Sequence, residues 1–515
     1  MLKPHKRLRQ YHGSGFSGIN IKRGLMTNDI RVRIAPSPSG NLHIGTARTA
    51  LFNFLFAKKV GGKFILRIED TDIERSNDEF KQNIFDSLKA LGLTWDEGPD
   101  VGGEYGPYCQ SERFDIYPKY ARQLVENGHA YECFCTPEEL EAEKQHSMEN
   151  KQAHVYSGKC CNLTPEEREE LRSKGLLPSI RFKVPKDEQV IFNDLVKGEL
   201  KFDSNLIGDF VIMKSNNTPT YNFAVVVDDM LMKISHILRG EDHISNTPKQ
   251  ILIYKALGAV AAREGCKSDI IPEFGHLGMI LAPDRSKLSK RHGATAVSDF
   301  VKVGYLIDAL VNFVALLGWS PSDGEEIKTI GEIAQDFRIN EVSSSNSIFE
   351  YDKLNWMNGQ YIKKMDVLKL TDLIIPFLEG YDLSEYSRSK LERIVEVTRE
   401  PLTVLSEIKE DAKYFFGQDT DLCEVEEVIN SGASQDVISY AFEACSGWNF
   451  DSEENIHDKL AELREHFKAQ GIKPKDTMWA VRAALTGRTK GADISAVISL
   501  LGKDKVKSRL AKALR

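Results

Sequence analysis

The first part of the chain alternates short strand-like runs with one long amphipathic segment. Residues 31–35 form the first run, which Pro36 ends, and residues 63–68 form the second, directly after two glycines. Between them, residues 46–59 place alanine, leucine and phenylalanine on one helical face. A strand, a helix and a strand in such close succession predict a βαβ unit, and therefore a parallel sheet covered by helices.

The middle and the end of the chain follow different patterns. Residues 101–218 are rich in turns and mix short helices with strands such as 179–184, which indicates an insertion. Strand character returns at 221–227 and 232–238, and the acidic stretch 410–427 predicts a solvated linker or loop. Beyond about residue 305 the pattern is helical. The clearest predicted helices cover 305–317, 390–408, 475–485 and 494–514.

These changes of pattern predict an α/β protein built from several parts. A chain of 515 residues corresponds to about three or four domains. We expect a Rossmann-like domain with a parallel sheet, split by an insertion and followed by an all-α region. The expected segments are an extension at 1–27, two halves of the sheet domain at 28–100 and 219–305, the insertion at 101–218, a connecting region at 306–365 and a helical domain at 366–515.

Composition excludes some classes of protein. The 68 basic and 76 acidic side chains give a net charge of −8, which argues against a wholly basic nucleic-acid binder but permits a local basic surface. No run approaches the ~18 apolar residues of a membrane span, so no membrane partner is expected. Eight cysteines are too few for a secreted disulfide framework, so a reducing compartment is expected.

The N-terminus allows two interpretations. Residues 1–26 carry six basic and no acidic side chains, as an organelle transit segment would. The alternative is an upstream start codon, because Met26 lies five residues before the first predicted strand and would itself be a natural beginning. We expect a cytoplasmic protein, with mitochondrion or plastid as the alternative if 1–26 is a transit peptide.

The segment 33–46 joins the first strand to the first helix and could bind an anion. Ligands bind at the carboxyl ends of parallel strands, where Gly40 and Gly45 would let the backbone approach closely. The N-terminus of the helix and the side chain of His43 would supply donors to a triphosphate. The alternative is an ordinary Pro/Ser/Gly turn.

A second candidate is the run Lys287-Leu-Ser-Lys-Arg291. Three bases and a serine in five residues suit a mobile loop that clamps phosphates, with lysine as a point charge and arginine as a fork. Taken alone, such a run is common on protein surfaces.

Together, the two motifs and the split domain resemble the class I aminoacyl-tRNA synthetases. Those enzymes activate an amino acid with ATP, release pyrophosphate and transfer the aminoacyl group to tRNA. Seven further segments resemble the bacterial or organellar glutamyl-tRNA synthetases. They are Arg33-Ile-Ala-Pro-Ser-Pro-Ser-Gly40, Arg67-Ile-Glu-Asp-Thr-Asp72, Asp96-Glu-Gly-Pro-Asp-Val-Gly102, Gly106-Pro-Tyr-Cys-Gln-Ser-Glu-Arg113, Arg239-Gly-Glu-Asp-His243, Trp356-Met-Asn-Gly359 and Arg482-Ala-Ala-Leu-Thr-Gly487.

The resemblance implies roles for individual residues and a dependence on ATP with Mg²⁺. Thr46 stands where the family's signature often has its last histidine, and Val225 stands where an asparagine is common. The implied catalytic residues are His43, Gly45, Lys287, Lys290 and Arg291. The implied ATP-binding residues are His43, Gly45, Thr46, Asp242, His243 and Lys290. The implied L-glutamate-binding residues are Arg33, Ala35, Ser37, Glu69, Tyr221 and Arg239.

A cysteine cluster in the insertion predicts a metal site. Cys133 and Cys135 place two thiolates on one knuckle, and Cys160 could complete a tetrahedral zinc site. Some relatives carry structural zinc with the pattern Cys-x-Cys, then Tyr-x-x-x-Cys, which here also includes Tyr156. The fourth ligand stays open between the tyrosine oxygen and Cys161, and a reduced cysteine cluster without metal is the alternative.

The resemblance also implies partners. It makes 101–218 the acceptor-binding insertion, 306–365 the stem-contact region and 366–515 the anticodon-binding domain, with Arg393 near the third anticodon base. We expect a glutamate–tRNA ligase that acts on tRNA-Glu, with tRNA-Gln as an open second substrate, and a monomer. The alternatives are a truncated paralogue that glutamylates a tRNA base, and a non-catalytic scaffold; the helical half and the intact motifs argue against them.

Overall fold

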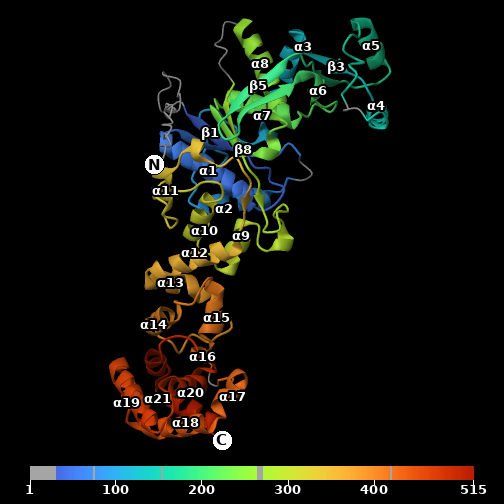
Figure 1. The fold of residues 1–515 in the computed structure, drawn as a ribbon. Coiled ribbons are helices and arrows are strands. Elements are labelled where there is room, and N and C mark those ends of the chain that lie inside the picture. The colour runs from blue at the N-terminus through green and yellow to red at the C-terminus, as the bar shows by residue number, and fades with distance from the viewer. Residues whose placement is uncertain (1–29, 73–75, 152–154, 264–270, 418–419, 515) are drawn as a thin grey trace, which may run out of the picture.

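The computed structural model describes residues 30–72, 76–151, 155–263, 271–417 and 420–514 (Figure 1). The predicted extension at 1–27, and with it both interpretations of the N-terminus, lies outside the described residues. Figure 1 shows an elongated molecule with the sheet domain and the insertion at one end and the helical region at the other. Among the described residues, no helix is both long enough and apolar enough to cross a membrane.

A four-stranded parallel sheet forms the centre of the first domain. The helix α1 (Ile44–Val60) connects its first two strands, beginning at the N-cap His43 and ending at Gly61, whose φ of 68° glycine adopts without strain. This confirms the predicted βαβ unit and the α/β fold class. In spatial order the strands are β2 (Lys63–Leu66), β1 (Arg31–Ile34), β8 (His236–Gly240) and β9 (Glu273–Leu277).

The order of these strands fixes where a ligand can bind. The chain leaves β1 toward β2 on one side and leaves β8 toward β9 on the other, through α8 (Thr247–Arg263). The crevice outside the carboxyl ends of β1 and β8 is therefore the topological switch point of the sheet. The other helices and strands of this domain are α2 (Asp78–Ala90), α7 (Tyr221–Leu231), α9 (Val297–Val303), α10 (Ile307–Ala315), α11 (Ile330–Asp336), β10 (Ile280–Leu281) and β11 (Ser347–Ile348).

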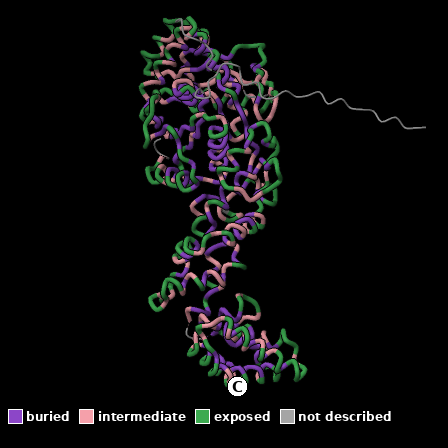
Figure 2. Tube along the Cα trace, turned by 90° about the vertical axis from the view of Figure 1, so that its left-hand side faces the viewer, coloured by how far each residue is buried: buried purple, intermediate pink, exposed green. Residues whose placement is uncertain are grey.

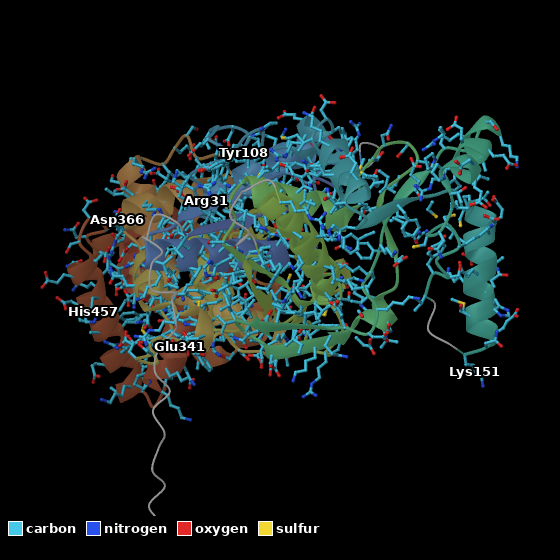
Figure 3. All side chains as sticks on the ribbon, turned by 90° about the horizontal axis from the view of Figure 1, so that it is seen from above. Arg31, Tyr108, Lys151, Glu341, Asp366 and His457 are labelled. Atoms are coloured by element: carbon cyan, nitrogen blue, oxygen red, sulfur yellow. The ribbon has the colours of Figure 1, made fainter. Side chains whose placement is uncertain are left out.

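The insertion between β2 and β8 folds into its own sheets and helices. In Figure 3, Lys151, two residues past the end of the outer helix α4 (Pro137–Glu149), lies far from Arg31 in the central sheet. Neither α4 nor α5 (Pro165–Ser173) buries a residue, and each begins with a threonine capping box. The elements are α3 (Tyr117–Glu126), an antiparallel sheet of β3 (Ala130–Cys133), β4 (Ser179–Phe182) and β7 (Phe210–Met213), the hairpin β5 (Gln189–Asp194) and β6 (Gly198–Asp203), α4 (Pro137–Glu149), α5 (Pro165–Ser173) and α6 (Ser204–Ile207).

The helical region has its own hydrophobic core. Figure 2 shows buried residues along the inside of these helices, and the core begins with Leu306 and Ala309 of the preceding domain. Residues 305–310 contribute side chains to this core and to the core of the sheet domain, which joins the two parts. The helices are α12 (Tyr351–Lys364), α13 (Val367–Ile374), α14 (Arg388–Thr398), α15 (Ile408–Asp411), α16 (Lys413–Phe416), α17 (Glu426–Ile429), α18 (Gly432–Ala444), α19 (Glu453–Ala469), α20 (Pro474–Thr486) and α21 (Ile494–Ala513).

Three sequence-based predictions of elements are wrong. Residues 221–227 form the start of helix α7 and not a strand, because a buried helix can carry a run of β-branched residues that resembles a central strand. The helix predicted at 390–408 ends at Thr398, shortly before Pro401, which disfavours helix in the residue that precedes it. The acidic stretch 410–427 is largely short helices and not a loop.

Gly304, at the end of α9, determines how tightly the two parts can join. Its φ is 98°, and a Cβ added there would lie 2.8 Å from the backbone nitrogen of Leu405. We expect Gly304→Ala to lower the free energy of unfolding by about 1–3 kcal/mol, through backbone strain and this clash. Gly324→Ala is the matched control, since its φ of 76° is strained but its Cβ meets open space. Equal losses for both variants in thermal unfolding would contradict the close approach.

Candidate active site

A cavity of about 630 Å³ opens at the switch point of the sheet. It is lined by eleven of the residues predicted for ATP and glutamate and by Lys287 of the predicted catalytic set, although they come from segments more than 200 residues apart in the chain. The predicted residues that line it are Arg33, Ala35, Ser37, His43, Gly45, Thr46, Glu69, Tyr221, Arg239, Asp242, His243 and Lys287.

The N-terminus of α1 gives one wall of this cavity its positive potential. The Nδ1 atom of His43 accepts a hydrogen bond of 3.4 Å from the backbone N–H of Gly45, which leaves Nε2–H as a donor. Burial, reinforced by the charge of Lys287, lowers the pKa of His43, so its ring is neutral at pH 7. A neutral donor, a lysine and the positive end of the α1 dipole together suit the phosphates of a nucleotide.

The basic run Lys287–Arg291 contributes to the same wall of the cavity through Lys287. Lys287 lines the cavity and forms a bridge with Leu281 of β10, so its backbone is anchored. Arg291 does not line the cavity: its Nη2 donates to Ser286 Oγ at 3.1 Å and its Nε to His292 Nε2 at 3.1 Å. The side chain of Lys290 lies outside the described part of the structure. The structure therefore brings Lys287, but not Arg291, to the site.

Arg239 carries a positive charge, and no carboxylate of the described residues pairs with it. It is 4% exposed, and its Nη2 donates to Thr247 Oγ1 at 2.7 Å and to Gln250 Oε1 at 2.8 Å. Its Nε donates to His276 Nε2 at 3.2 Å. Within the described residues, its Nη1 is buried and has no hydrogen-bond partner. A buried, unsatisfied cationic donor in a residue that lines a cavity indicates a place for an anion.

Arg33, the second predicted carboxylate ligand, is already paired. Its Nε and Nη2 donate to the two carboxylate oxygens of Asp229 at 3.2 and 3.3 Å. Asp229 also accepts from Arg67 Nη1 at 2.5 Å, and Arg67 Nη2 donates to Glu69 at 3.1 Å. Although burial raises the pKa of Asp229, the charges of Arg33 and Arg67 hold it below its usual value. This ionic chain fixes Arg33 and Glu69 at the edge of the cavity.

Tyr221 and His243 form a polar rim beside Arg239. The Tyr221 hydroxyl lies 3.0 Å from His243 Nδ1. Burial, with a further contribution from Arg239, lowers the pKa of His243 to about 4, so this ring is neutral at pH 7. Burial raises the pKa of Tyr221 to about 12. The rim therefore offers neutral hydrogen-bonding groups to a polar ligand.

The sequence did not point to several lining residues. Arg48 of α1 is buried and donates to the carbonyl oxygens of Gly278 and Leu317, and burial lowers its pKa to about 10. Glu241 accepts from the backbone N–H of Met279 at 3.1 Å. Arg48 follows the Gly45 motif by one helical turn, so its position was a usable signal. The segment 277–280 gave no such signal in the sequence, because it lines the cavity through the position of its backbone.

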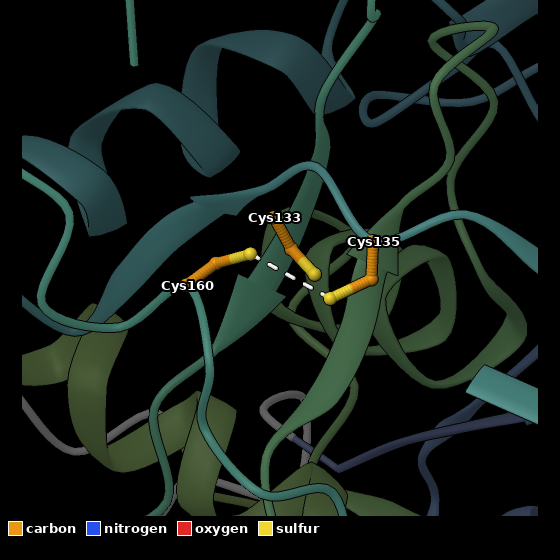
Figure 4. Close-up of side chains that lie close together, drawn as sticks. All are labelled: Cys133, Cys135 and Cys160. Carbon is orange, nitrogen blue, oxygen red and sulfur yellow. Dashed lines mark hydrogen bonds between the residues drawn. The ribbon is translucent and has the colours of Figure 1, made fainter. Parts of the chain in front are cut away.

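The predicted metal ligands converge in the insertion, away from the cavity. Figure 4 shows the thiols of Cys133, Cys135 and Cys160 pointing toward one another, and these sulfur atoms all lie within 4.8 Å. The Tyr156 hydroxyl lies 3.5 Å from Cys133 Sγ and 3.3 Å from Cys135 Sγ. All four predicted ligands are therefore close enough to share one ion. Cys161 is not part of this group of sulfur atoms.

Comparison with known proteins assigns the family. Residues 29–356 match the family model described as tRNA synthetases class I (E and Q), catalytic domain, and residues 369–514 match an anticodon binding domain. The chain is 47% identical over 487 residues to a glutamate–tRNA ligase of Carboxydothermus hydrogenoformans, covering 93% of this chain and 99% of the relative. The chain belongs to the glutamate–tRNA ligase family of class I synthetases.

Two further relatives of this glutamate–tRNA ligase family agree along nearly the whole chain. A glutamate–tRNA ligase of Desulforamulus reducens is 45% identical, covering 94% of this chain and all of the relative. The crystal structure of a glutamate tRNA ligase from Elizabethkingia meningosepticum, in complex with its amino acid, superposes with a TM-score of 0.83 at 34% identity, over 94% of this chain and 99% of that one. The expected family and fold class are thereby confirmed.

Arg393, the predicted anticodon contact, is engaged within the helical region. From α14 its Nε and Nη2 donate to the two carboxylate oxygens of Glu453, at 3.0 and 2.6 Å. Glu453 is the first residue of α19, so the pair ties two helices together across the surface. The Arg393 side chain is 45% exposed.

Proposed function

We propose that this chain activates L-glutamate with ATP and transfers it to the 3′ end of tRNA-Glu. The observation that carries the proposal is Arg239, a buried cation with an unsatisfied N–H, in the same cavity as the N-terminus of α1. One cavity thus offers a site for a carboxylate beside a site for phosphates. That is the pair of groups that an acyl adenylate joins.

In this mechanism the glutamate α-carboxylate attacks the α-phosphorus of ATP and pyrophosphate leaves. No protein nucleophile is needed, so the protein contributes position and charge. His43 Nε2–H and the Lys287 ammonium would face the phosphates, with Lys290 and Arg291 on the same loop, and Mg²⁺ would accompany ATP. The tRNA ribose hydroxyl then attacks the acyl carbon and AMP leaves.

The glutamate subsite needs a cation for the side-chain carboxylate and an anion for the ammonium. Arg239 supplies the cation. Arg33 can contribute only the N–H groups that do not donate to Asp229. Glu69, held by Arg67, supplies the anion. Glutamine would bring no charge to Arg239, which is the basis for rejecting it.

The test is ATP–pyrophosphate exchange with glutamate or with glutamine, each with and without a tRNA pool. We expect exchange with glutamate and not with glutamine, and only when tRNA is present. We also expect charging of tRNA-Glu. Charging of tRNA-Gln in the same assay would establish a second tRNA substrate. Absence of exchange in every condition, with the protein folded, would favour the scaffold alternative.

For the insertion we propose a structural zinc ion held by three thiolates and Tyr156. Two thiolates of a tetrahedral zinc site lie about 3.8 Å apart, because each Zn–S bond is ~2.3 Å. Cys135 Sγ and Cys160 Sγ are 3.6 Å apart, which fits. The Arg181 guanidinium lies 3.8 Å from the centre of the Tyr156 ring and would offset the excess negative charge.

Replacing Cys135 with serine tests this site. We expect about one zinc per chain in the wild type and a near-complete loss in Cys135→Ser, because one of the three thiolates is removed. Cys423→Ser is the control, since Cys423 is exposed in the helical region. Elemental analysis of the purified proteins measures the difference. Equal zinc content in the two variants would show that the cluster binds none.

For the anticodon we propose Arg393 as a base-reading residue. Its fork is occupied by Glu453, so a base edge would have to replace that carboxylate. The exchange is feasible because exposed ion pairs contribute only about 0–1 kcal/mol.

A further inference from the structure

The hairpin β5–β6 of the insertion reaches the glutamate subsite through two buried residues. Asp194 ends β5, and its Oδ2 accepts from Nδ1–H of His276 at 2.5 Å, with both side chains fully buried. His276, on β9, presents its other nitrogen to Arg239, whose Nε donates to Nε2 at 3.2 Å, and to the Thr247 hydroxyl, whose Oγ1 lies 3.0 Å from Nε2. A continuous path therefore runs from the insertion to the arginine that is proposed to bind the substrate carboxylate.

The polarity of this path is fixed by Asp194. The Oδ1 atom of Asp194 accepts backbone N–H groups from Val196, Lys197 and His276 at 2.9–3.1 Å, so Oδ2 alone faces the imidazole. A carboxylate oxygen can only accept, so the proton of the neutral ring must be on Nδ1. Nε2 is then an acceptor, which is the state that the Nε–H of Arg239 requires.

Packing supports the same connection. Phe192 of β5 meets the Phe274 ring edge-on at 5.9 Å, and the Arg239 guanidinium lies 5.6 Å from the centre of that ring. At the hairpin turn, Lys197 pairs with Glu241, two residues after Arg239. The hairpin thus contacts both the Phe274 ring, which lies next to the Arg239 guanidinium, and the segment that follows Arg239.

We propose that Asp194 and His276 are positioning residues that hold Arg239 in the orientation needed for the glutamate side chain. The insertion is then part of the glutamate-selecting machinery. This inference rests on the proposed role of Arg239 in binding glutamate.

The decisive variant is Asp194→Asn. Its oxygen would stay with the three backbone N–H groups, so its amide nitrogen would face His276 and donate to Nδ1. The ring would then carry its proton on Nε2. The Nε–H of Arg239 would face this proton and lose its acceptor. We expect the KM for glutamate to rise roughly 10-fold or more, with kcat and the KM for ATP little changed, because a hydrogen bond to a charged group is lost.

Two substitutions of His276 separate orientation from packing. In His276→Gln the side-chain oxygen can accept from Arg239 while the amide nitrogen donates to Asp194, so glutamate affinity should be largely kept. His276→Leu fills the space without either bond and should behave like Asp194→Asn. Glu199→Gln, an exposed carboxylate-to-amide change on the same hairpin, is the matched control.

All variants are measured as full-length protein by pyrophosphate exchange with tRNA present, and by glutamate-induced shifts of the melting temperature. A KM for glutamate within about twofold of the wild type in folded Asp194→Asn would overturn the inference. A fall in kcat together with a rise in the KM values for both glutamate and ATP would indicate a purely structural role and would also overturn the inference. Arg239→Lys separates the two proposals: if it too binds glutamate normally, the role of Arg239 itself is wrong.

Discussion

Replacing Arg239 with alanine is expected to abolish selective glutamate activation. Truncating one partner of a buried charge pair costs about 2–5 kcal/mol, which corresponds to a loss of roughly 30- to 5000-fold in kcat/KM for glutamate. The loss should appear in KM for glutamate and not in KM for ATP, because Arg239 lies on β8 while the expected phosphate donors begin at α1. Pyrophosphate exchange at varied glutamate and varied ATP measures both.

Arg239→Lys is the informative companion to this variant. Lysine keeps the charge but loses the fork that serves His276, Thr247 and Gln250 at once, so it should fall between alanine and the wild type. Arg399→Ala is a control for removing an arginine elsewhere, since Arg399 bonds the carbonyl of Met365 in the helical region. Unchanged glutamate kinetics in both Arg239 variants would place the carboxylate subsite elsewhere in the cavity.

The local parts of the site could be predicted from the sequence because they depend on neighbouring residues. The segment from β1 to α1 contains its own turn, N-cap and helix signals, and the resemblance then gave roles to His43 and Gly45. Tyr221, which the resemblance assigned to the glutamate site, lines the cavity although its element was predicted as a strand. Its position depends on which residue ends the insertion, and not on whether the next ten residues are helical.

The partners of the site residues could not be predicted, because they depend on contacts between distant segments. Nothing near Arg33 in the sequence shows that Asp229 occupies two of its donors. The same is true of Asp194 and His276, which are 82 residues apart and meet only because the hairpin packs on β9. A single sequence indicates which side chains have suitable chemistry, but their partners decide which of them are free to bind a ligand.

The same reasoning applies to the phosphate side, where we expect His43 to have two separable roles. As the N-cap of α1 it stabilises the helix, and as a neutral donor it would contact ATP. Removing one preorganised donor to a transition state typically costs 10²–10³-fold in kcat, and we expect about this loss of exchange in His43→Ala. The lost N-cap should lower the free energy of unfolding by only ~1 kcal/mol.

His43→Asn separates these two roles of the side chain. Asparagine is a good N-cap, so the unfolding free energy should return to that of the wild type. Its amide is shorter than imidazole and, when its oxygen caps the helix, cannot place a donor where Nε2–H lies, so exchange should stay low. A stable variant with little exchange would assign His43 to the reaction. Wild-type-like exchange in folded His43→Asn would show that the helix N-terminus and Lys287 are sufficient without it.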